Sequence, residues 1–74
     1  MNEPELAVAF GLNLRFKRKK SGITQQALAE KVGVTRVYIG FIERGETSIT
    51  LEKVYRLADA LECDVFDLLP RLPD

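Results

Sequence analysis

Apolar residues recur at helical spacing along most of the chain. The first such set is Leu6, Phe10 and Leu14. Side chains three or four residues apart share one face of an α-helix, so the pattern predicts a helix over residues 4–20. Its bounds agree with local chemistry, because Pro4 suits the first helical position and Gly22 suits the position just after a helix.

A second helix is predicted over residues 25–32, QQALAEKV, with Thr24 as its N-cap and Gly33 at its end. A longer one is predicted over 51–61, after the N-cap residue Thr50. Its apolar stripe, expected to face the core, is Leu51, Val54, Leu57, Ala58 and Leu61.

The last predicted helix covers residues 65–69, VFDLL, after the N-cap residue Asp64. Pro70 is expected to stop this helix, because proline lacks the amide hydrogen that a continuing helix needs. Residues 70–74 are then a tail.

The segment GVTRVYIG, residues 33–40, is rich in residues that favour strands. A single strand would leave its backbone groups unpaired, and the chain has no second strand-like run. We therefore predict a helix over residues 36–43, capped by Thr35. Counting helix faces puts Val37, Ile39, Ile42 and Glu43 inward; the side chains left outward are Arg36, Tyr38 and Phe41.

These elements predict an all-α fold of five short helices in a single domain, residues 1–74. The chain has 74 residues, 46% of them apolar and 30% charged, as in ordinary globular domains. The net charge is zero but is unevenly distributed. Residues 1–41 carry seven basic and three acidic side chains, a net of +4, and residues 42–74 carry four basic and eight acidic ones, a net of −4. Such asymmetry suits a protein that meets a polyanion with one face.

Composition also argues against other classes of function. There is no histidine and only one cysteine, Cys63, so the chain has few side chains that could form a metal site and none for histidine-dependent catalysis. We expect no enzyme activity, cofactor, metal or small-molecule ligand. Cys63 is expected to be a buried thiol in a reducing cytoplasm. No apolar run is long enough to span a membrane, and the N-terminus lacks the basic start of a signal peptide.

The predicted helices 25–32 and 36–43, joined by a tight turn at Gly33, form a candidate helix-turn-helix. From about residue 10 to residue 69 the chain resembles the lambda-repressor-like helix-turn-helix family, which includes phage repressors and the controller proteins of restriction–modification systems. The residues that carry the resemblance are Thr24-Gln25, Leu28-Ala29, Gly33-Val34, Ile39, Ile42-Glu43-Arg44-Gly45, Thr50-Leu51, Ala58 and Leu61.

The resemblance implies that the helix over residues 36–43 enters the major groove of double-stranded DNA. Its base-reading residues would be Thr35, Arg36, Val37 and Tyr38. Arginine can donate two hydrogen bonds to guanine, and the methyl groups of Val37 suit a thymine methyl. The family register thus places Val37 at the groove, whereas the face count places it inward.

Other roles follow from the same resemblance. The residues expected to contact the DNA backbone are Thr24, Gln25, Arg44, Ser48, Lys17 and Lys20. Gln25 is also expected to support the reading helix. Arg18 is expected to pair with Glu43 and so to connect the first and third helices. Gly40 departs from the polar residues usual there, and we expect close approach of the helix over 25–32 as the reason.

One reading helix covers only a few base pairs, so single-domain relatives suggest a homodimer on a two-fold symmetric operator. The candidate dimer residues are Ile49, Tyr55, Val65, Phe66 and Leu69. The expected function is transcriptional regulation, including autoregulation or restriction–modification control. The alternative is an antitoxin or protein-binding adaptor that uses the same fold, with Phe16 and Tyr55 as anchors for a partner.

Overall fold

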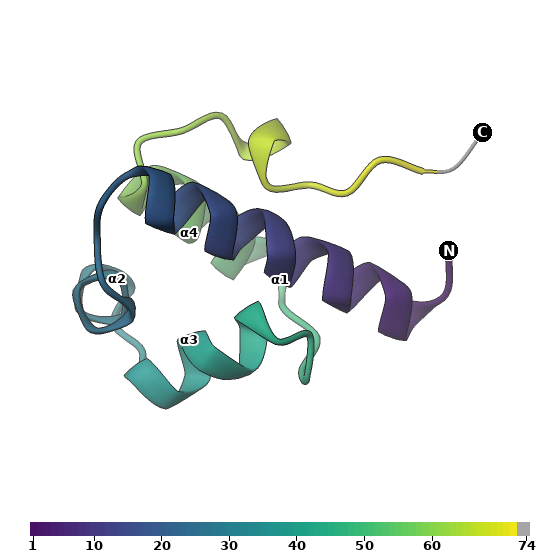
Figure 1. Cartoon of the computed structure of the whole chain (residues 1–74), viewed down its shortest axis with the longest axis horizontal. Helices are drawn as coiled ribbons and strands as arrows, with labels where there is room; N and C mark the ends of the chain where they lie inside the picture. The colour runs from purple at the N-terminus through teal and green to yellow at the C-terminus, as the bar shows by residue number, and fades with distance from the viewer. Residues whose placement is uncertain (73–74) are drawn as a thin grey trace.

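The computed structural model describes residues 1–72 and shows an all-helical arrangement (Figure 1). Within these residues there are four α-helices and one 3₁₀ turn. Their bounds are α1 Glu3–Lys20, α2 Gln25–Val32, α3 Arg36–Glu43, α4 Leu51–Ala60 and η1 Val65–Asp67. The last two residues of the tail expected over 70–74 lie outside the described residues.

Each α-helix begins at a side chain that caps its first turn. Thr24, Thr35 and Thr50 accept hydrogen bonds from the amides three residues ahead, at 3.0, 3.1 and 3.3 Å. Asn2 does the same for Glu5 at 2.9 Å, so α1 begins at Glu3, one residue earlier than predicted. A cap of this kind contributes about 1 kcal/mol to helix stability. The three predicted threonine caps are confirmed.

The prediction of five helices is wrong in its last element. Where a helix was expected over 65–69, the structure has a single 3₁₀ turn, Val65–Asp67. Asp64 caps it as predicted, accepting from the amide of Phe66 at 2.9 Å. The Leu68 amide then bonds back to the carbonyl of Val65, only three residues away. Leu68 is fully buried, which ends the turn by anchoring the chain to the core.

The turn between α2 and α3 depends on Gly33. This residue has a left-handed backbone with φ of 77°, where an L side chain is strained. The amides of Gly33 and Val34 both bond to the carbonyl of Ala29, at 2.9 and 3.0 Å. The chain therefore leaves α2 sharply and enters α3 two residues later at the cap residue Thr35, which completes the predicted helix-turn-helix.

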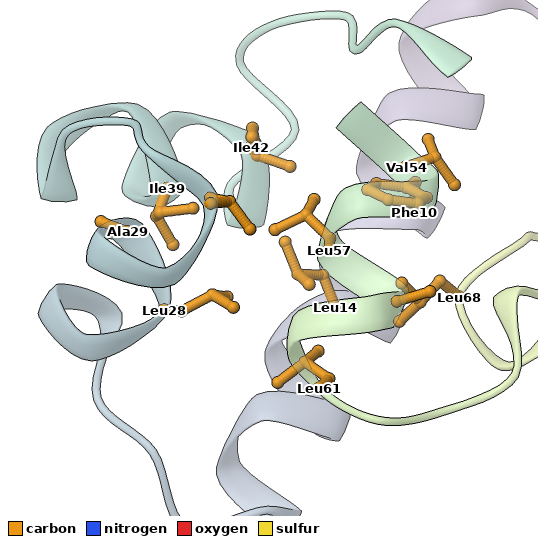
Figure 2. Packing of buried hydrophobic residues seen from close by; sticks show 12 residues of the cluster. Phe10, Leu14, Leu28, Ala29, Ile39, Ile42, Val54, Leu57, Leu61 and Leu68 are labelled. Atoms are coloured by element: carbon orange, nitrogen blue, oxygen red, sulfur yellow. The ribbon is translucent and has the colours of Figure 1, made fainter. Parts of the chain in front are cut away.

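Residues from all four helices and the C-terminal segment form one core (Figure 2). Its fully buried large side chains are Leu14, Leu28, Ile39, Ile42, Leu57 and Leu68. Leu51 was expected in this core but is 69% exposed, so the stripe on α4 begins at Val54. Leu51 is the first residue of its helix, where the chain has not yet turned towards the core.

Two backbones approach closely where α1 crosses α3. A Cβ atom added to Gly11 would lie 2.3 Å from the carbonyl oxygen of Ile42 and 2.6 Å from that of Glu43. Only glycine fits there. α1 therefore lies directly on the last turn of α3, and the orientation of α3 depends on this contact.

The C-terminal segment lies beside α1, as Figure 1 shows. The side-chain amide of Asn13 donates to the carbonyl of Leu68 at 3.1 Å, and the Lys17 ammonium lies 3.5 Å from a carboxylate oxygen of Asp67. This face of α1 is thus occupied by the chain's own C-terminal part. No helix in residues 1–72 is long and apolar enough to cross a membrane.

Candidate nucleic-acid interface

Helix α3 has a buried side and an exposed side. Ile39, Ile42 and Glu43 face the core, whereas Val37 is 54% and Phe41 is 42% exposed. The face count that put Val37 inward is therefore wrong, and the register of the family is right about its exposure. Arg36, the first residue of α3, is also exposed. The exposed side of α3 thus starts with a basic residue and continues with apolar ones.

Tyr38 was expected to point outward, but it is half-buried and packs against the core. The ammonium of Lys53 lies 5.8 Å from the centre of its ring, within the range of a cation–π contact. Its backbone amide is also held by Thr35. Tyr38 thus helps to attach α3 to α4, and only part of its side chain remains available to a partner.

A chain of hydrogen bonds connects the core to Arg36. In the buried part, Arg18 donates to both carboxylate oxygens of Glu43, at 2.6 and 3.1 Å, which is the pair that the resemblance implies. The Gln25 side chain donates to the same carboxylate at 3.0 Å. Arg36 in turn donates to the side-chain oxygen of Gln25 at 3.4 Å.

Glu43 determines which group donates and which accepts in each of these hydrogen bonds. An ionised carboxylate can only accept hydrogen bonds, so the Gln25 amide must present its nitrogen to Glu43. Its oxygen is then left to face Arg36, which can only donate. A buried ion pair thereby orients Gln25, and Gln25 supports the guanidinium of Arg36. The expected support of the reading helix by Gln25 is present in the structure.

The N-terminus of α2 lies beside this chain. Gln25 is its first residue, and Thr24 caps it through the amide of Ala27. The remaining first-turn amides have no partner within the helix and carry the positive end of its dipole. There is no acidic side chain in the first turn of α2. Such a helix end favours an anion, and phosphate is a common one.

Helix α2 was expected to approach closely at Gly40. The structure shows instead that Gly40 makes room for Arg44. A Cβ atom at Gly40 would lie 2.9 Å from Nη1 of Arg44. The Arg44 guanidinium also lies 5.4 Å from the centre of the Phe41 ring, and its Nε donates to Glu46 at 2.8 Å. Arg44 therefore lies along the exposed side of α3.

The other residues expected at the DNA backbone lie in different places. Lys17 faces Asp67, on the side of α1 that meets the C-terminal segment. Lys20 is exposed in the last turn of α1. Ser48 is exposed and lies near Ala7 in the first half of α1. Arg15 was not among the predicted contacts, yet it shares a surface hollow with Gln25 and Arg44; counting helix faces relative to Arg18 would have found it.

The candidate dimer residues belong to another surface. Tyr55 and Phe66 are 56% and 76% exposed, while Ile49, Val65 and Leu69 are half-buried and pack against the core. Leu51 adds exposed apolar area next to them. A mostly apolar hollow of about 270 Å³ adjoins this surface; among its lining residues are Leu6, Ile49, Leu51 and Leu69.

Cys63 is half-buried and forms no disulfide. Burial raises the pKa of its thiol above the usual value, Lys17 lowers it, and Asp67 and Asp64 raise it further. The thiol is therefore neutral near pH 7. Within the described part of the chain, no three side chains of the metal-binding types cluster together.

These features define a helix-turn-helix protein, and comparison with known families agrees. Residues 14–68 match the helix-turn-helix family model HTH_3, and the chain belongs to this family. The match includes the caps of α2, α3 and α4, the Gly33 turn, the Arg18–Glu43 pair and the whole of α3.

Several characterised proteins are similar to this chain. The control protein C.SmaI of Serratia marcescens is 42% identical over 59 residues, which is 80% of this chain and 70% of that protein. Among solved structures, the restriction-modification controller protein C.AhdI of Aeromonas hydrophila has a TM-score of 0.88 and 33% identity, covering 93% of this chain and all of that one. The c2 repressor of Salmonella phage P22, solved with a synthetic operator, has a TM-score of 0.74 and 42% identity, covering 81% of this chain and 91% of that one.

Proposed function

We propose that this chain is a sequence-specific DNA-binding transcriptional regulator that reads a two-fold symmetric operator as a homodimer. The family and the relatives support DNA binding and regulation. The observation that supports base reading by Arg36 is the series of hydrogen bonds that runs from Arg18 through Glu43 and Gln25 to Arg36. Its last bond, from Arg36 to Gln25, favours one position of the Arg36 guanidinium before DNA binds, which lowers the entropy lost on binding.

In this proposal, α3 lies in the major groove and Arg36 donates two hydrogen bonds to a guanine. Val37 meets a neighbouring base through its methyl groups, and thymine offers a matching methyl. Thr35 and Tyr38 contribute at the edges of the reading surface. Gln25 and the N-terminus of α2 contact a backbone phosphate, which fixes the depth at which α3 enters the groove.

The homodimer brings two α3 helices to half-sites about 34 Å apart, one turn of DNA. We propose that the dimer forms through the apolar surface of α4, η1 and the residues next to them. Its residues are Ile49, Leu51, Tyr55, Val65, Phe66 and Leu69. Most of the acidic side chains belong to this C-terminal half of the sequence, so dimerisation there keeps them away from DNA.

Regulation would then follow protein concentration, because dimer formation and operator occupancy both depend on it. This behaviour suits a gene that controls its own level. The similarity to C.SmaI and C.AhdI extends the proposal to control of a restriction–modification system, in the cytoplasm.

The first test is selection of duplexes from a random pool by the purified protein. We expect a symmetric consensus whose half-sites are one helical turn apart, with a guanine at the position that Arg36 reads. A consensus without symmetry would contradict the dimeric operator. Failure to enrich any sequence would contradict sequence-specific binding.

The second test is Arg36→Ala on the selected duplex. Loss of one bidentate contact should cost about 1–3 kcal/mol and abolish the preference for guanine at that position. Arg36→Lys is the matched control, since it keeps the charge but not the planar pair of donors. Binding titrations on the guanine duplex and on its single-base variants measure both effects. Unchanged base preference in Arg36→Ala would exclude Arg36 as a reader.

A further inference from the structure

A surface hollow lies where α1, α2 and α3 meet. It has a volume of about 240 Å³ and is lined by Arg15, Arg18, Gln25, Glu43 and Arg44. Arg18 and Glu43 neutralise each other through their two hydrogen bonds, and both are buried. The positive side chains that this hollow presents to solvent are Arg15 on α1 and Arg44 just after α3; Arg44 is ion-paired with Glu46, whereas Arg15 forms no ion pair among residues 1–72.

Neither exposed arginine uses its full hydrogen-bonding capacity inside the chain. Arg15 forms no ion pair and no side-chain hydrogen bond among residues 1–72. Arg44 donates through Nε to Glu46, and its Nη1 lies against Gly40. Each guanidinium has five donor hydrogens, so most of them remain free for another acceptor.

We propose that this hollow binds one phosphate of the DNA backbone, with Arg15 as a contact that adds to Arg44 and Gln25. The inference rests on the proposed function and deepens it. Arginine suits phosphate because its planar donors match two phosphate oxygens, and such charge-assisted bonds are the stronger ones. The N-terminus of α2 adds its positive dipole end at Gln25.

The placement gives this phosphate a positioning role. α1 lies directly on α3 at Gly11, and Arg18 joins both helices through Glu43. A phosphate held by Arg15 and Arg44 therefore fixes α1 and α3 together against one DNA strand. Because phosphates carry no base identity, this contact sets the register of α3 in the groove without choosing the sequence.

The geometry assigns this role to Arg15 rather than to Lys17. Two residues apart on an α-helix, side chains point about 160° away from each other. Lys17 accordingly faces Asp67 in the C-terminal segment, while Arg15 faces the hollow. Within the run KRKK, Arg18 is thus buried. Arg15, the exposed residue that lines the hollow, lies before this run.

The first experiment compares the salt dependence of binding for the wild type, Arg15→Ala and Lys19→Ala on the selected duplex. Lys19 is the matched control, being exposed on the same helix with no ion pair among residues 1–72 and not lining the hollow. Arg15→Ala should reduce the steepness of log K against log[salt] by about 0.9 for each half-site, about 1.8 for the dimer on its operator, and should weaken all sequences equally. Lys19→Ala should change the slope by much less.

The second experiment replaces single phosphates of the duplex by uncharged methylphosphonates. For the wild type, one neutralised phosphate in each half-site should weaken binding severalfold, and for Arg15→Ala that effect should be clearly smaller, because only the contacts of Arg44, Gln25 and the N-terminus of α2 remain to be lost. Equal slopes for the wild type and Arg15→Ala, or loss of affinity without coupling to any phosphate, would overturn the assignment. If the wild type itself binds no duplex in a salt-dependent manner, the proposed function fails instead, so the two failures are distinguishable.

Discussion

Gly40 lies inside helix α3, directly beside the side chain of Arg44. A glycine inside a helix costs about 1 kcal/mol relative to alanine, so its presence in α3 needs a reason. The reason is the Arg44 guanidinium, whose Nη1 lies where a Cβ atom would be. This contact keeps Arg44 along the exposed side of α3, where it also lies over Phe41.

Gly40→Ala should therefore separate stability from binding. The free energy of unfolding should rise by up to about 1 kcal/mol, because alanine favours the helix and Arg44 is a flexible side chain that can move away. Affinity for the selected duplex should fall, since Arg44 leaves the hollow. Urea unfolding and DNA titration measure the two quantities. On an Arg44→Ala background the loss of affinity should disappear; if it persists, Gly40 acts in another way.

Among the helices, the first residue of each was easier to predict than the contacts between one helix and another. A cap is a hydrogen bond between residues three apart, so Thr24, Thr35 and Thr50 could be predicted as caps from the sequence alone. The end of the chain was different. The pattern VFDLL looks helical, but burial of Leu68 determines that only Val65–Asp67 completes a turn.

The crossing of α1 and α3 predicts a sharp effect of Gly11→Ala. The new methyl group would meet two backbone carbonyl oxygens, and a helix backbone cannot rotate away as a side chain does. We expect a loss of about 3 kcal/mol in the free energy of unfolding, at the upper end for overpacking.

The control for Gly11→Ala is its neighbour Leu12, which is 58% exposed. Leu12→Ala should change stability by no more than about 0.5 kcal/mol. Chemical denaturation of both variants decides the matter. If Gly11→Ala is as stable as Leu12→Ala, the two helices are not in the close contact described.

For the whole molecule, the hollow and the proposed dimer surface lie on different elements, although the hollow takes one exposed arginine from each half of the sequence. The hollow with Arg15 and Arg44 lies among α1, α2 and α3, whereas α4 and η1 carry the apolar surface proposed for dimerisation. Where the two halves meet, Lys17 pairs with Asp67. DNA and a second copy of the chain would thus use different surfaces and can be disrupted separately.

Tyr55→Glu should produce a folded monomer. Tyr55 is 56% exposed, so the change leaves the core intact, but it places a charge in the proposed dimer surface. Sedimentation should show the monomer mass, and binding to the full operator should weaken strongly while weak half-site binding remains. Phe16→Glu, at a 70% exposed position on α1, is the control and should remain dimeric. A dimeric Tyr55→Glu protein would place the dimer surface elsewhere.

Much of the site could be predicted because the helix-turn-helix depends on local signals. The caps, the glycine turn and the spacing of Ile39 and Ile42 are all properties of short segments, and they predict four of the elements nearly to the residue. The residues of α3 that face outward could not all be predicted. Counting helix faces put Val37 inward and Tyr38 outward, yet Val37 is 54% exposed, as the family register predicts, and Tyr38 is half-buried against the core beside Lys53 of α4.

The helices, the turn at Gly33 and the uneven distribution of charge could be predicted because they depend on neighbouring residues or on composition. The hollow that Arg15 shares with Gln25 and Arg44, and the close contact of Gly11 with α3, could not be predicted in this way. Contacts between residues far apart in sequence depend on how the helices cross, and helix crossing is determined by the packing of the whole core.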